Sequence, residues 1–484
     1  MKVLFIFSLQ NYQYSIKPLQ NQEQIQFGLS YLSSLLKSKD HYTDLLVITI
    51  GTKKSFIFDY IKQMNPEVIG FTAVATEYEF IFSIAKYIKS QFPSIFLIIG
   101  GPHTSLNPEN VITGPFDALC IGEGEFPILE LVEQLKTRKS PSSIQNLWIK
   151  KEGKIERNPI REFIQNLDIL PFPDRKIWQK WIRYPETRHV IFLGRGCPYQ
   201  CTYCCNHVLK KIAPGNYVRF RSVDNIMREL KKLIIEFPKT KEIYFEIETI
   251  GININFAIEL CLELEKVNEV IEHKLSYGIN LRITPKINFE PLFQALNRAN
   301  FRFINIGIES GSERIRTQIL KRYYSNKDII DTVKLAKNYG LKVSTYNLIG
   351  IPEETFEDFE KTINCNRICL PDWTQLSIFF PYQGTELYNV CREKGLLKYK
   401  VDQRMERRRA ILNLENFSKK QIQKEFEWFY YKVYRGSRPI YFIILRVFYS
   451  KLNSNPSFNR LYRLITSLSI FKRIELFFDK SRDF

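Results

Sequence analysis

The sequence predicts an α/β protein in which two parallel-sheet regions are followed by a helical region. Apolar runs alternate with stretches of helical period over 1–138 and again over 189–395, whereas 396–484 is basic, aromatic and helical in pattern. Alternating strands and helices are typical of parallel sheets covered by helices. We therefore expect a Rossmann-like doubly wound sheet, a connector over 139–188, a partial (β/α)6 barrel and a C-terminal helical region.

The first region is predicted from four apolar strands with helices between them. The strands are expected at 2–7, 44–50, 67–74 and 96–101, and the helices at 28–38, 56–64 and 79–90. The apolar run at the N-terminus has no small-residue cleavage site after it, so we expect a strand there and no signal peptide. In the connector we expect a β-hairpin turning at Glu152–Gly153, and prolines at 171 and 173 exclude a regular helix.

The barrel is predicted from six strand–helix units. Its strands are expected at 189–194, 242–248, 275–282, 303–310, 343–350 and 374–382, with helices such as 225–237 and 328–340 between them. Active sites of such barrels lie at the carboxyl ends of the strands. The cysteine-rich segment GRGCPYQCTYCCNH (194–207) follows the first of these strands. We therefore expect this segment on the active face of the barrel.

The composition of the chain indicates its cellular compartment and the charge of its binding partners. The 484 residues carry a formal charge of +19 and a pI near 9.3, which favours an anionic partner. No stretch of about 20 uninterrupted apolar residues occurs, so we expect no membrane-spanning helix. Without an export signal the thiols lie in a reducing compartment, so we expect a cytoplasmic protein. Clustered cysteines then favour metal binding or catalysis over disulfides.

Three cysteines have the spacing Cys-x-x-x-Cys-x-x-Cys: Cys197, Cys201 and Cys204. Zinc sites usually have paired Cys-x-x-Cys elements and four ligands, and a second pair is absent here. Three thiolates on a four-iron cluster would leave one iron open, and catalytic metals require an open position. The alternative is a structural zinc site completed by Cys205 or His207.

This segment, with Tyr203 before its last cysteine, resembles the signature of radical S-adenosylmethionine (radical SAM) enzymes. Later segments resemble that barrel in order: NLRITPK, INIGIESGSERI, NLIGIPEET and FFPYQGTELY. The N-terminal region resembles the cobalamin-binding domain that often precedes it, through FGLSYLSSLLK, EVIGFTAVATEY, IIGGPHTS, IGEGE and LPFPDR. Together these segments cover residues 1 to about 395.

The resemblance implies a 4Fe-4S cluster held by Cys197, Cys201 and Cys204, with S-adenosylmethionine at the open iron. A reductant such as flavodoxin or ferredoxin would drive its cleavage to a 5′-deoxyadenosyl radical, which takes hydrogen from an unactivated carbon. The carried-over contacts are Tyr203, Ile349 and Gly350 near the adenine, Glu309 at the ribose or amino group, Arg282 at a carboxylate, and Glu248 at the methionine amino group. For Glu309 and Arg282 the alternative is a structural ion pair.

Cobalamin contacts are expected where strands of the first region end. The candidates are Thr72, Thr76, Gly100, Gly101, His103, Gly122 and Glu123. Glycines let backbone approach a bulky ring, and hydroxyls can bond corrin amides. The sequence lacks Asp-x-His-x-x-Gly, so we expect no axial histidine, and we interpret His103 as a loop residue near the cofactor. The alternative is a domain that has lost its cofactor, with glycines that serve only as turns.

The chain departs from the family pattern at two further places. Ile247 and Glu248 stand where the cobalamin-type relatives commonly have paired aspartates, which leaves the role of Glu248 open. Glu353 replaces the usual glycine of the NLIGIPEET segment, which puts the geometry of that turn in question.

Four function classes follow from these features. We favour a cobalamin-dependent radical methyltransferase that acts on a lipid, saccharide or natural product. A rearrangement or ring-forming enzyme on the same scaffold is the alternative. A methylthiotransferase is set aside because the N-terminal region has one cysteine, Cys120, and that family has a second triad there. An iron–sulfur protein that binds nucleic acid is the non-enzymatic alternative, and the adenosyl-site segments argue against it.

The last region, 396–484, carries 20 Lys and Arg against 8 Asp and Glu. Basic, aromatic, amphipathic helices suit peripheral contact with an anionic membrane, where a lipid-linked substrate would be found. A helical cap on the barrel is the simplest alternative, and RNA binding is the least favoured.

Overall fold

The computed structural model describes residues 1–10, 16–397, 403 and 406–454, which form two compact units. Unit 1 comprises Met1–Tyr199, Cys204–Thr240 and Tyr382–Thr385. Unit 2 comprises Gln200–Tyr203, Lys241–Pro381 and the described residues from Glu386 onward. Each unit is described by itself below.

Unit 1 is built on a seven-stranded sheet with the order β2-β1-β3-β4-β5-β6-β7, in which β1 to β5 are parallel. The strands are β1 (Lys2–Leu9), β2 (Tyr42–Thr49), β3 (Val68–Thr72), β4 (Phe96–Gly100), β5 (Ala118–Cys120), β6 (Leu147–Lys151) and β7 (Lys154–Arg157). The helices are α1 (Phe27–Lys37), α2 (Lys54–Met64), α3 (Tyr78–Gln91), α4 (Pro102–Leu106), α5 (Pro108–Val111) and α6 (Glu125–Lys136).

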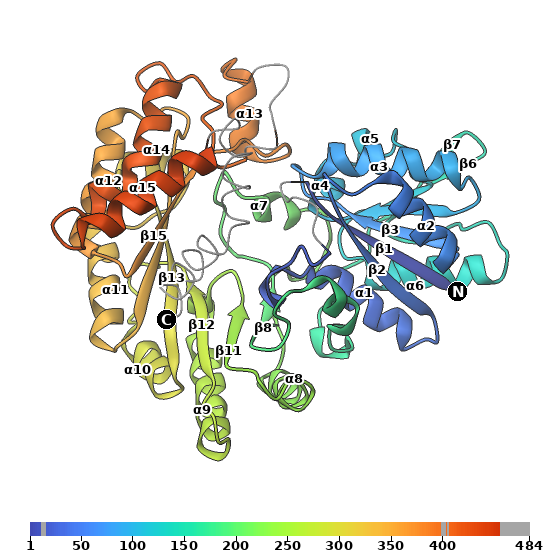
Figure 1. The fold of residues 1–484 in the computed structure, drawn as a ribbon, viewed down its shortest axis with the longest axis horizontal. Coiled ribbons are helices and arrows are strands. Elements are labelled where there is room, and N and C mark those ends of the chain that lie inside the picture. Colours follow the sequence, from blue (N-terminus) through green and yellow to red (C-terminus); the bar gives the residue numbers. More distant parts are fainter. Residues whose placement is uncertain (11–15, 398–402, 404–405, 455–484) are drawn as a thin grey trace. The chain divides into compact units, whose positions relative to one another are not determined.

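Helices cover both faces of this sheet, with α1 and α6 on one face and α2 and α3 on the other (Figure 1). The sheet is therefore the doubly wound, Rossmann-like sheet that the sequence predicts. Its strand order reverses between β1 and β3, and open α/β sheets bind ligands at such a switch point, outside the carboxyl ends of the strands. The predicted hairpin is also confirmed, since β6 and β7 pair antiparallel around Glu152–Gly153.

The rest of unit 1 carries the cysteine-rich segment. Its elements are β8 (Arg188–Phe192), β9 (Gly194–Arg195), α7 (Asn206–Leu209), β10 (Arg219–Phe220) and α8 (Val223–Glu236). Strands β9 and β10 pair antiparallel, with Arg195 opposite Arg219. This two-residue ribbon joins the start of the segment to a point 24 residues later, and strands so short leave no periodic pattern in the sequence.

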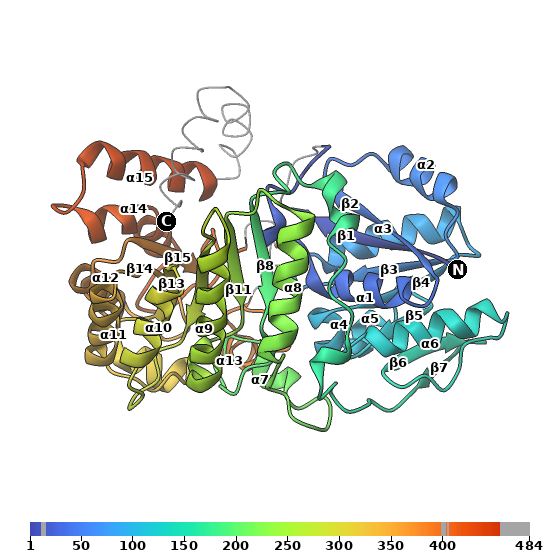
Figure 2. The same ribbon diagram turned by 90° about the horizontal axis from the view of Figure 1, so that it is seen from below.

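Unit 2 holds five parallel strands in the order β15-β14-β13-β12-β11. They are β11 (Glu242–Glu246), β12 (Ser276–Leu281), β13 (Phe301–Glu309), β14 (Lys342–Ile349) and β15 (Trp373–Ile378), and the helices between them are α9 (Ile254–Val270), α10 (Glu290–Arg298), α11 (Asn326–Asn338) and α12 (Phe356–Cys369). These helices lie on one face of the sheet (Figure 2), as in a partial barrel. The strand expected first in the barrel is β8, which clusters with unit 1.

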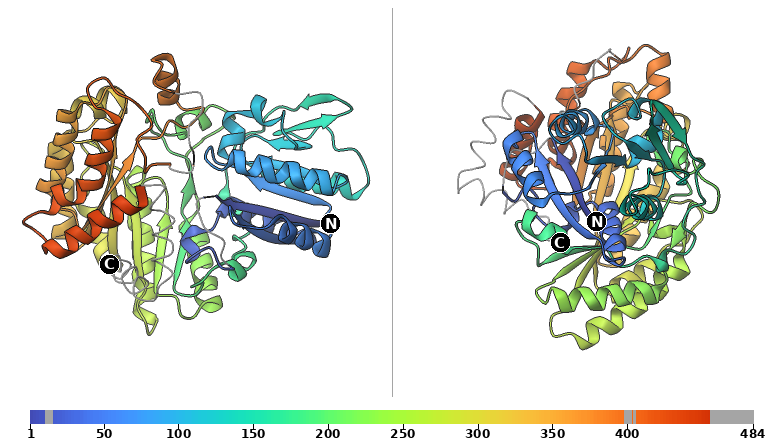
Figure 3. Two further views of the ribbon diagram at one scale, coloured as in Figure 1. Left: turned by 45° about the horizontal axis from the view of Figure 1, so that its top comes forward. Right: turned by 90° about the vertical axis from the view of Figure 1, so that its right-hand side faces the viewer.

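Three helices follow in unit 2: α13 (Glu386–Glu393), α14 (Lys419–Tyr434) and α15 (Ile440–Ser454). The helices α14 and α15 pack side by side, and α14 also packs on α12 and β15 (Figure 3). Its buried side chains Ile422, Phe429 and Val433 share one apolar core with Ile349 and Ile378 at the ends of β14 and β15. The helical C-terminal region is confirmed as far as residue 454, and the predicted helices beyond it lie outside the described residues.

No helix of the described part of the chain is long and apolar enough to cross a membrane.

Candidate functional site

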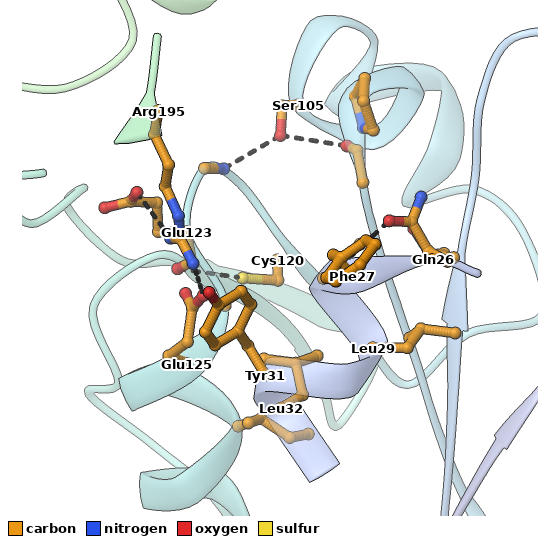
Figure 4. Close-up of a pocket in the computed structure, with 18 of the residues that line it drawn as sticks. Gln26, Phe27, Leu29, Tyr31, Leu32, Ser105, Cys120, Glu123, Glu125 and Arg195 are labelled. Carbon is orange, nitrogen blue, oxygen red and sulfur yellow. Dashed lines mark hydrogen bonds and ion pairs between the residues drawn. The ribbon is translucent and has the colours of Figure 1, made fainter. Parts of the chain in front are cut away.

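A cavity of about 400 Å³ opens at the carboxyl edge of the sheet in unit 1 (Figure 4). Its walls come from the start of α1, from the ends of β3, β4 and β5, and from the loops that follow them. Most of the lining is apolar, with Phe27, Leu29 and Leu32 on one side. The volume and the mainly apolar lining are typical of cofactor pockets, which use a few polar groups for orientation.

Five of the seven predicted cobalamin contacts line this cavity: Thr72, Gly100, Gly101, Gly122 and Glu123. Gly101 has a φ of 97°, and a Cβ there would lie 2.7 Å from the Thr72 Oγ1 atom, so the turn requires glycine. A Cβ on Gly100 would meet only ordinary contacts, the nearest at 3.7 Å. The backbone therefore leaves room at the strand ends for a ligand to approach closely.

The other two candidates, Thr76 and His103, do not line the cavity. The His103 ring packs on Tyr78 with ring centroids 4.5 Å apart, and its buried Nε2 atom has no hydrogen-bond partner in the described part of the chain. Burial lowers the pKa of His103 to about 4, so the imidazole is neutral at pH 7. The structure places His103 beside the strand end and outside the pocket.

Sequence reasoning missed several lining residues, including Tyr31, Ser105 and Cys120. Ser105 Oγ donates to the Gly101 carbonyl and accepts from the Gly122 N–H, so it joins two of the loops (Figure 4). Burial raises the pKa values of the Tyr31 hydroxyl and the Cys120 thiol to about 12 each, so both keep their protons. Tyr31 is 7% exposed, and its hydroxyl makes no hydrogen bond to a described residue. Amphipathic spacing marks Tyr31 only as a buried helix residue.

One end of the cavity is a wall of ion pairs. Arg195 Nη1 lies 2.9 Å from Glu123 Oε1, and its Nη2 lies 2.6 Å from Glu125 Oε1. Arg219 Nη1 lies 3.0 Å from both oxygens of Glu123. Although burial raises the pKa of the Glu123 carboxyl, the two guanidinium groups and the Ile164 N–H hold it below its ordinary value. Glu123 thus lines the pocket, but both its oxygens bond to protein groups, and its contact with cobalamin stays a prediction.

The three motif cysteines are divided between the units: Cys197 and Cys204 belong to unit 1, and Cys201 belongs to unit 2 with Tyr203. Within the described residues, no set of three or more His, Cys, Asp or Glu side chains is arranged as a metal site. Cys204 Sγ accepts from the backbone N–H and the side-chain amide of Asn206, each at 3.5 Å. The Asn206 amide oxygen in turn accepts from the Tyr217 hydroxyl at 2.5 Å.

In unit 2, Arg322 joins two predicted site residues. Its Nη1 atom lies 2.8 Å from the Tyr203 hydroxyl and 2.7 Å from Glu309 Oε1. Glu309 ends β13 in a left-handed conformation, with a φ of 63°, next to a register shift between β13 and β14. Such strained residues persist where the surroundings fix them, often at ligand sites. Glu309 Oε2 bonds to no described residue. Nothing in the sequence marks Arg322.

Arg282 and Glu248 follow neighbouring strands. Arg282 Nη1 lies 2.7 Å from Cys201 Sγ, and its backbone N–H donates to Thr249 Oγ1. Arg282 is buried, whereas Glu248 is exposed and makes no hydrogen bond or ion pair with a described residue. The predicted side chains thus follow the carboxyl ends of β11, β12 and β13, which are adjacent in the sheet.

The segment after β14 forms a tight turn closed by a carboxyl group. Glu354 Oε2 accepts from the Gly350 N–H at 2.6 Å and from the Ile351 N–H at 3.3 Å, while its buried Oε1 has no partner among the described residues. Burial raises the pKa of Glu354 to about 8. Glu353, which replaces the family's glycine, has a φ of 67°, so it adopts the left-handed conformation that glycine takes readily.

Two known protein families match parts of this chain. The family described as the radical SAM superfamily matches residues 191–365, and the B12 binding domain matches residues 21–132. The chain thus carries a radical SAM domain and a B12-binding domain. It is therefore an enzyme whose cofactors are a 4Fe-4S cluster, S-adenosylmethionine and cobalamin. This result is against the non-enzymatic, nucleic-acid-binding alternative.

Three relatives show how far the likeness extends. An uncharacterized methyltransferase of Pyrococcus horikoshii is 29% identical over 401 residues, which are 82% of this chain and 85% of the relative. An anaerobic magnesium-protoporphyrin IX monomethyl ester cyclase of Rubrivivax gelatinosus is 25% identical over 385 residues, 76% of this chain and 66% of the relative. The structure of the radical SAM methyltransferase TsrM from Kitasatospora setae, with cobalamin and a [4Fe-4S] cluster, is 16% identical, with a TM-score of 0.63 over 81% of this chain and 75% of that one.

Proposed function

We propose that this enzyme methylates an unactivated carbon of a small molecule: a lipid, a saccharide or a natural product. The observation that carries the proposal is the cavity at the switch point of the B12-binding domain, with glycine backbone on its walls and the Tyr31 hydroxyl, which bonds to no described residue. A pocket of this kind fits part of a corrinoid, which combines apolar surface with amide and nucleotide groups. The methyltransferase relatives support the same reaction.

Each cofactor would be bound by a different set of residues. Cys197, Cys201 and Cys204 would hold the cluster, and hydrogen bonds from Asn206 and Arg282 to sulfur would tune it. Tyr203, Glu309 and the Ile349–Gly350 backbone would orient S-adenosylmethionine, with Arg322 holding the first two in place. Thr72, Gly100, Gly101 and Gly122 would line the corrinoid site. The cofactors supply the radical and the methyl group, and the protein supplies binding and orientation.

The ligand assignment is tested with single alanine variants of the four clustered cysteines, purified and reconstituted without oxygen. Changing Cys197, Cys201 or Cys204 should abolish the brown chromophore, and Cys205→Ala should retain it. Loss of iron in Cys205→Ala together with its retention in Cys201→Ala would show that the assignment is wrong.

The reaction is tested with S-adenosylmethionine that carries a deuterated methyl group, supplied with cobalamin, a reductant and candidate substrates. A methyltransferase should give S-adenosylhomocysteine, 5′-deoxyadenosine and a product with the label. Release of 5′-deoxyadenosine without S-adenosylhomocysteine would instead favour a rearrangement or ring-forming enzyme. The similarity to the cyclase of Rubrivivax gelatinosus is the reason to test this second candidate.

Two partners complete the proposal. The cluster needs an electron, for which a flavodoxin or ferredoxin is the expected donor. The second partner is an anionic membrane surface. One face of α15 exposes five large apolar side chains, each at least 41% exposed, and α15 contains no Asp or Glu: Ile440, Tyr441, Ile444, Leu445 and Phe448. Apolar side chains in a region rich in Lys and Arg fit an anionic lipid interface.

Liposome co-sedimentation tests the membrane contact. Wild-type protein should bind acidic vesicles better than neutral ones, and salt should weaken the binding. Ile444→Glu with Phe448→Glu should reduce binding, while Ile235→Glu, an equally simple change at an exposed apolar residue of α8, should not. Equal binding to both vesicle types at all salt concentrations would contradict electrostatic attachment.

A further inference from the structure

Arg195 connects the pocket of unit 1 to the segment that carries Cys197. It stands two residues before Cys197. Its Nη1 atom donates a hydrogen bond to Glu123, and its Nη2 atom donates one to Glu125. Glu123 lies in the loop between β5 and α6, Glu125 is the first residue of α6, and both line the pocket. A planar guanidinium with two fixed donor directions can hold two carboxylates at once, which a lysine ammonium does with less geometric control.

The backbone on either side of Arg195 is locked against a second segment. A Cβ on Gly194 would lie 2.3 Å from the Arg219 carbonyl oxygen, and a Cβ on Gly196 would lie 2.0 Å from the Tyr217 carbonyl oxygen. Both distances are shorter than any real Cβ contact, so residues 194–196 pack on 217–219 backbone to backbone. The close backbone contact and the two ion pairs of Arg195 therefore fix the chain just before Cys197 to the wall of the pocket.

The pocket touches the cysteine segment on both sides. Arg195 and Gly196, just before Cys197, line the cavity, and so do Leu209 and Ile212, which follow Cys204. Tyr31 completes the wall, with the Arg195 guanidinium 5.3 Å from its ring centroid. A ligand in the cavity would therefore contact residues that flank the segment on both sides.

We propose that Arg195 is a positioning residue that couples corrinoid occupancy of the pocket to the state of the cluster-binding segment. The inference rests on the proposed function, because it assigns the pocket to cobalamin and Cys197 and Cys204 to the cluster. Coupling between two binding sites is reciprocal, so the cluster tightens corrinoid binding by the same factor by which corrinoid favours the loaded cluster.

The experiment measures hydroxocobalamin binding to the full chain by absorbance, before and after anaerobic reconstitution of the cluster. Wild-type protein should bind the corrinoid about fivefold or more tightly once the cluster is loaded. Arg195→Lys keeps the positive charge but loses the two fixed N–H donor directions of the guanidinium. Glu125→Gln removes one of the two carboxylates that bind Arg195. In both variants the two dissociation constants should become equal, while iron content stays at the wild-type level.

Arg221→Lys is the matched control, because Arg221 is buried, belongs to the same part of the chain and pairs with Glu229 outside the pocket wall. It should keep the wild-type coupling. Two results would overturn the inference and leave the proposed function intact. One is a wild-type change in hydroxocobalamin affinity on cluster loading that persists in Arg195→Lys and Glu125→Gln. The other is a wild-type affinity that is the same with and without the cluster. A wild-type protein that binds no corrinoid in either state would overturn both.

Discussion

Arg282 Nη1 lies 2.7 Å from the Sγ atom of Cys201, although 81 residues separate them in the chain. The arginine sits directly after β12, and its buried guanidinium gives this sulfur a charged donor. Cys204 has a different environment, with two uncharged donors from Asn206. Since hydrogen bonds to the sulfurs help to set the reduction potential of an iron–sulfur cluster, the chain assigns unequal donors to two of its proposed ligands.

Asn206→Ala should make the reduction potential of the 4Fe-4S cluster more negative, because the reduced cluster gains most from donors to sulfur. A hydrogen bond is worth about 0.5–1.5 kcal/mol, so the shift for one electron is on the order of 20–60 mV. Redox titration followed by electron paramagnetic resonance measures it. Tyr217→Phe is the control, since it removes a partner of the Asn206 oxygen and leaves the amide donor. An unchanged potential in Asn206→Ala would contradict the role.

Glu354 should make the stability of the protein fall as pH rises. Its pKa is raised to about 8 in the folded state, so the folded chain retains a proton that the unfolded chain releases above about pH 4.5. The contribution is complete below the unfolded pKa and is lost as pH increases through 8, by at most about 1.4 kcal/mol per pH unit. Denaturant unfolding at several pH values measures this slope, and Glu354→Gln should flatten it. A slope identical in both proteins would exclude Glu354 as its source.

Glu353→Gly should stabilise unit 2. Glu353 has a φ of 67°, a conformation that costs a residue with a Cβ about 1–2 kcal/mol and glycine much less. Its ion pair with Lys394 is nearly half exposed on both sides and contributes little. After the larger chain entropy of glycine is counted, we expect a gain of about 0.5–1 kcal/mol. Thermal unfolding compares it with Glu353→Gln, which keeps the strain and should be close to neutral.

Gly124→Leu should obstruct the pocket without disturbing the sheet. Gly124 has a φ of −101°, which any residue adopts, and a Cβ there would lie 3.6 Å from Leu32, at ordinary contact. Gly101 is a poor choice for this purpose, because its positive φ excludes other residues whether or not a ligand binds. Hydroxocobalamin affinity should fall about tenfold or more, with the iron–sulfur spectrum and the melting temperature retained. Undiminished affinity would place the corrinoid elsewhere.

Local pattern predicts the long strands and helices well. For β13, expected at 303–310, the structure gives Phe301–Glu309, and the helix expected at 328–340 is α11 at Asn326–Asn338. The three residues of β5 and the two-residue strands β9 and β10 are too short to show a period. Patterning also marks α14 as amphipathic, but it does not reveal that Ile422 packs on Gly350. These contacts depend on the folded topology.

For the candidate site, motif spacing identifies the cysteines and the strand-end loops, which are adjacent in sequence to recognisable strands. It misses Arg322, Asn206 and Arg195, whose roles depend on partners elsewhere in the fold. Arg195 and Glu123, for example, are 72 residues apart in the chain and meet only in the folded structure. Glu353 shows the opposite case, in which the sequence departs from the family and the backbone conformation expected of a glycine is retained.

The β9–β10 ribbon also changes how iron would be delivered. By pairing Arg195 with Arg219 it closes the intervening chain into a ring, and it does so without any metal. The ends of that ring come together during folding, so the loss of chain entropy on closure does not reduce the free energy of metal binding. Metal binding at Cys197 and Cys204 would therefore start from a segment that is already closed at its base, and the apoprotein should remain folded.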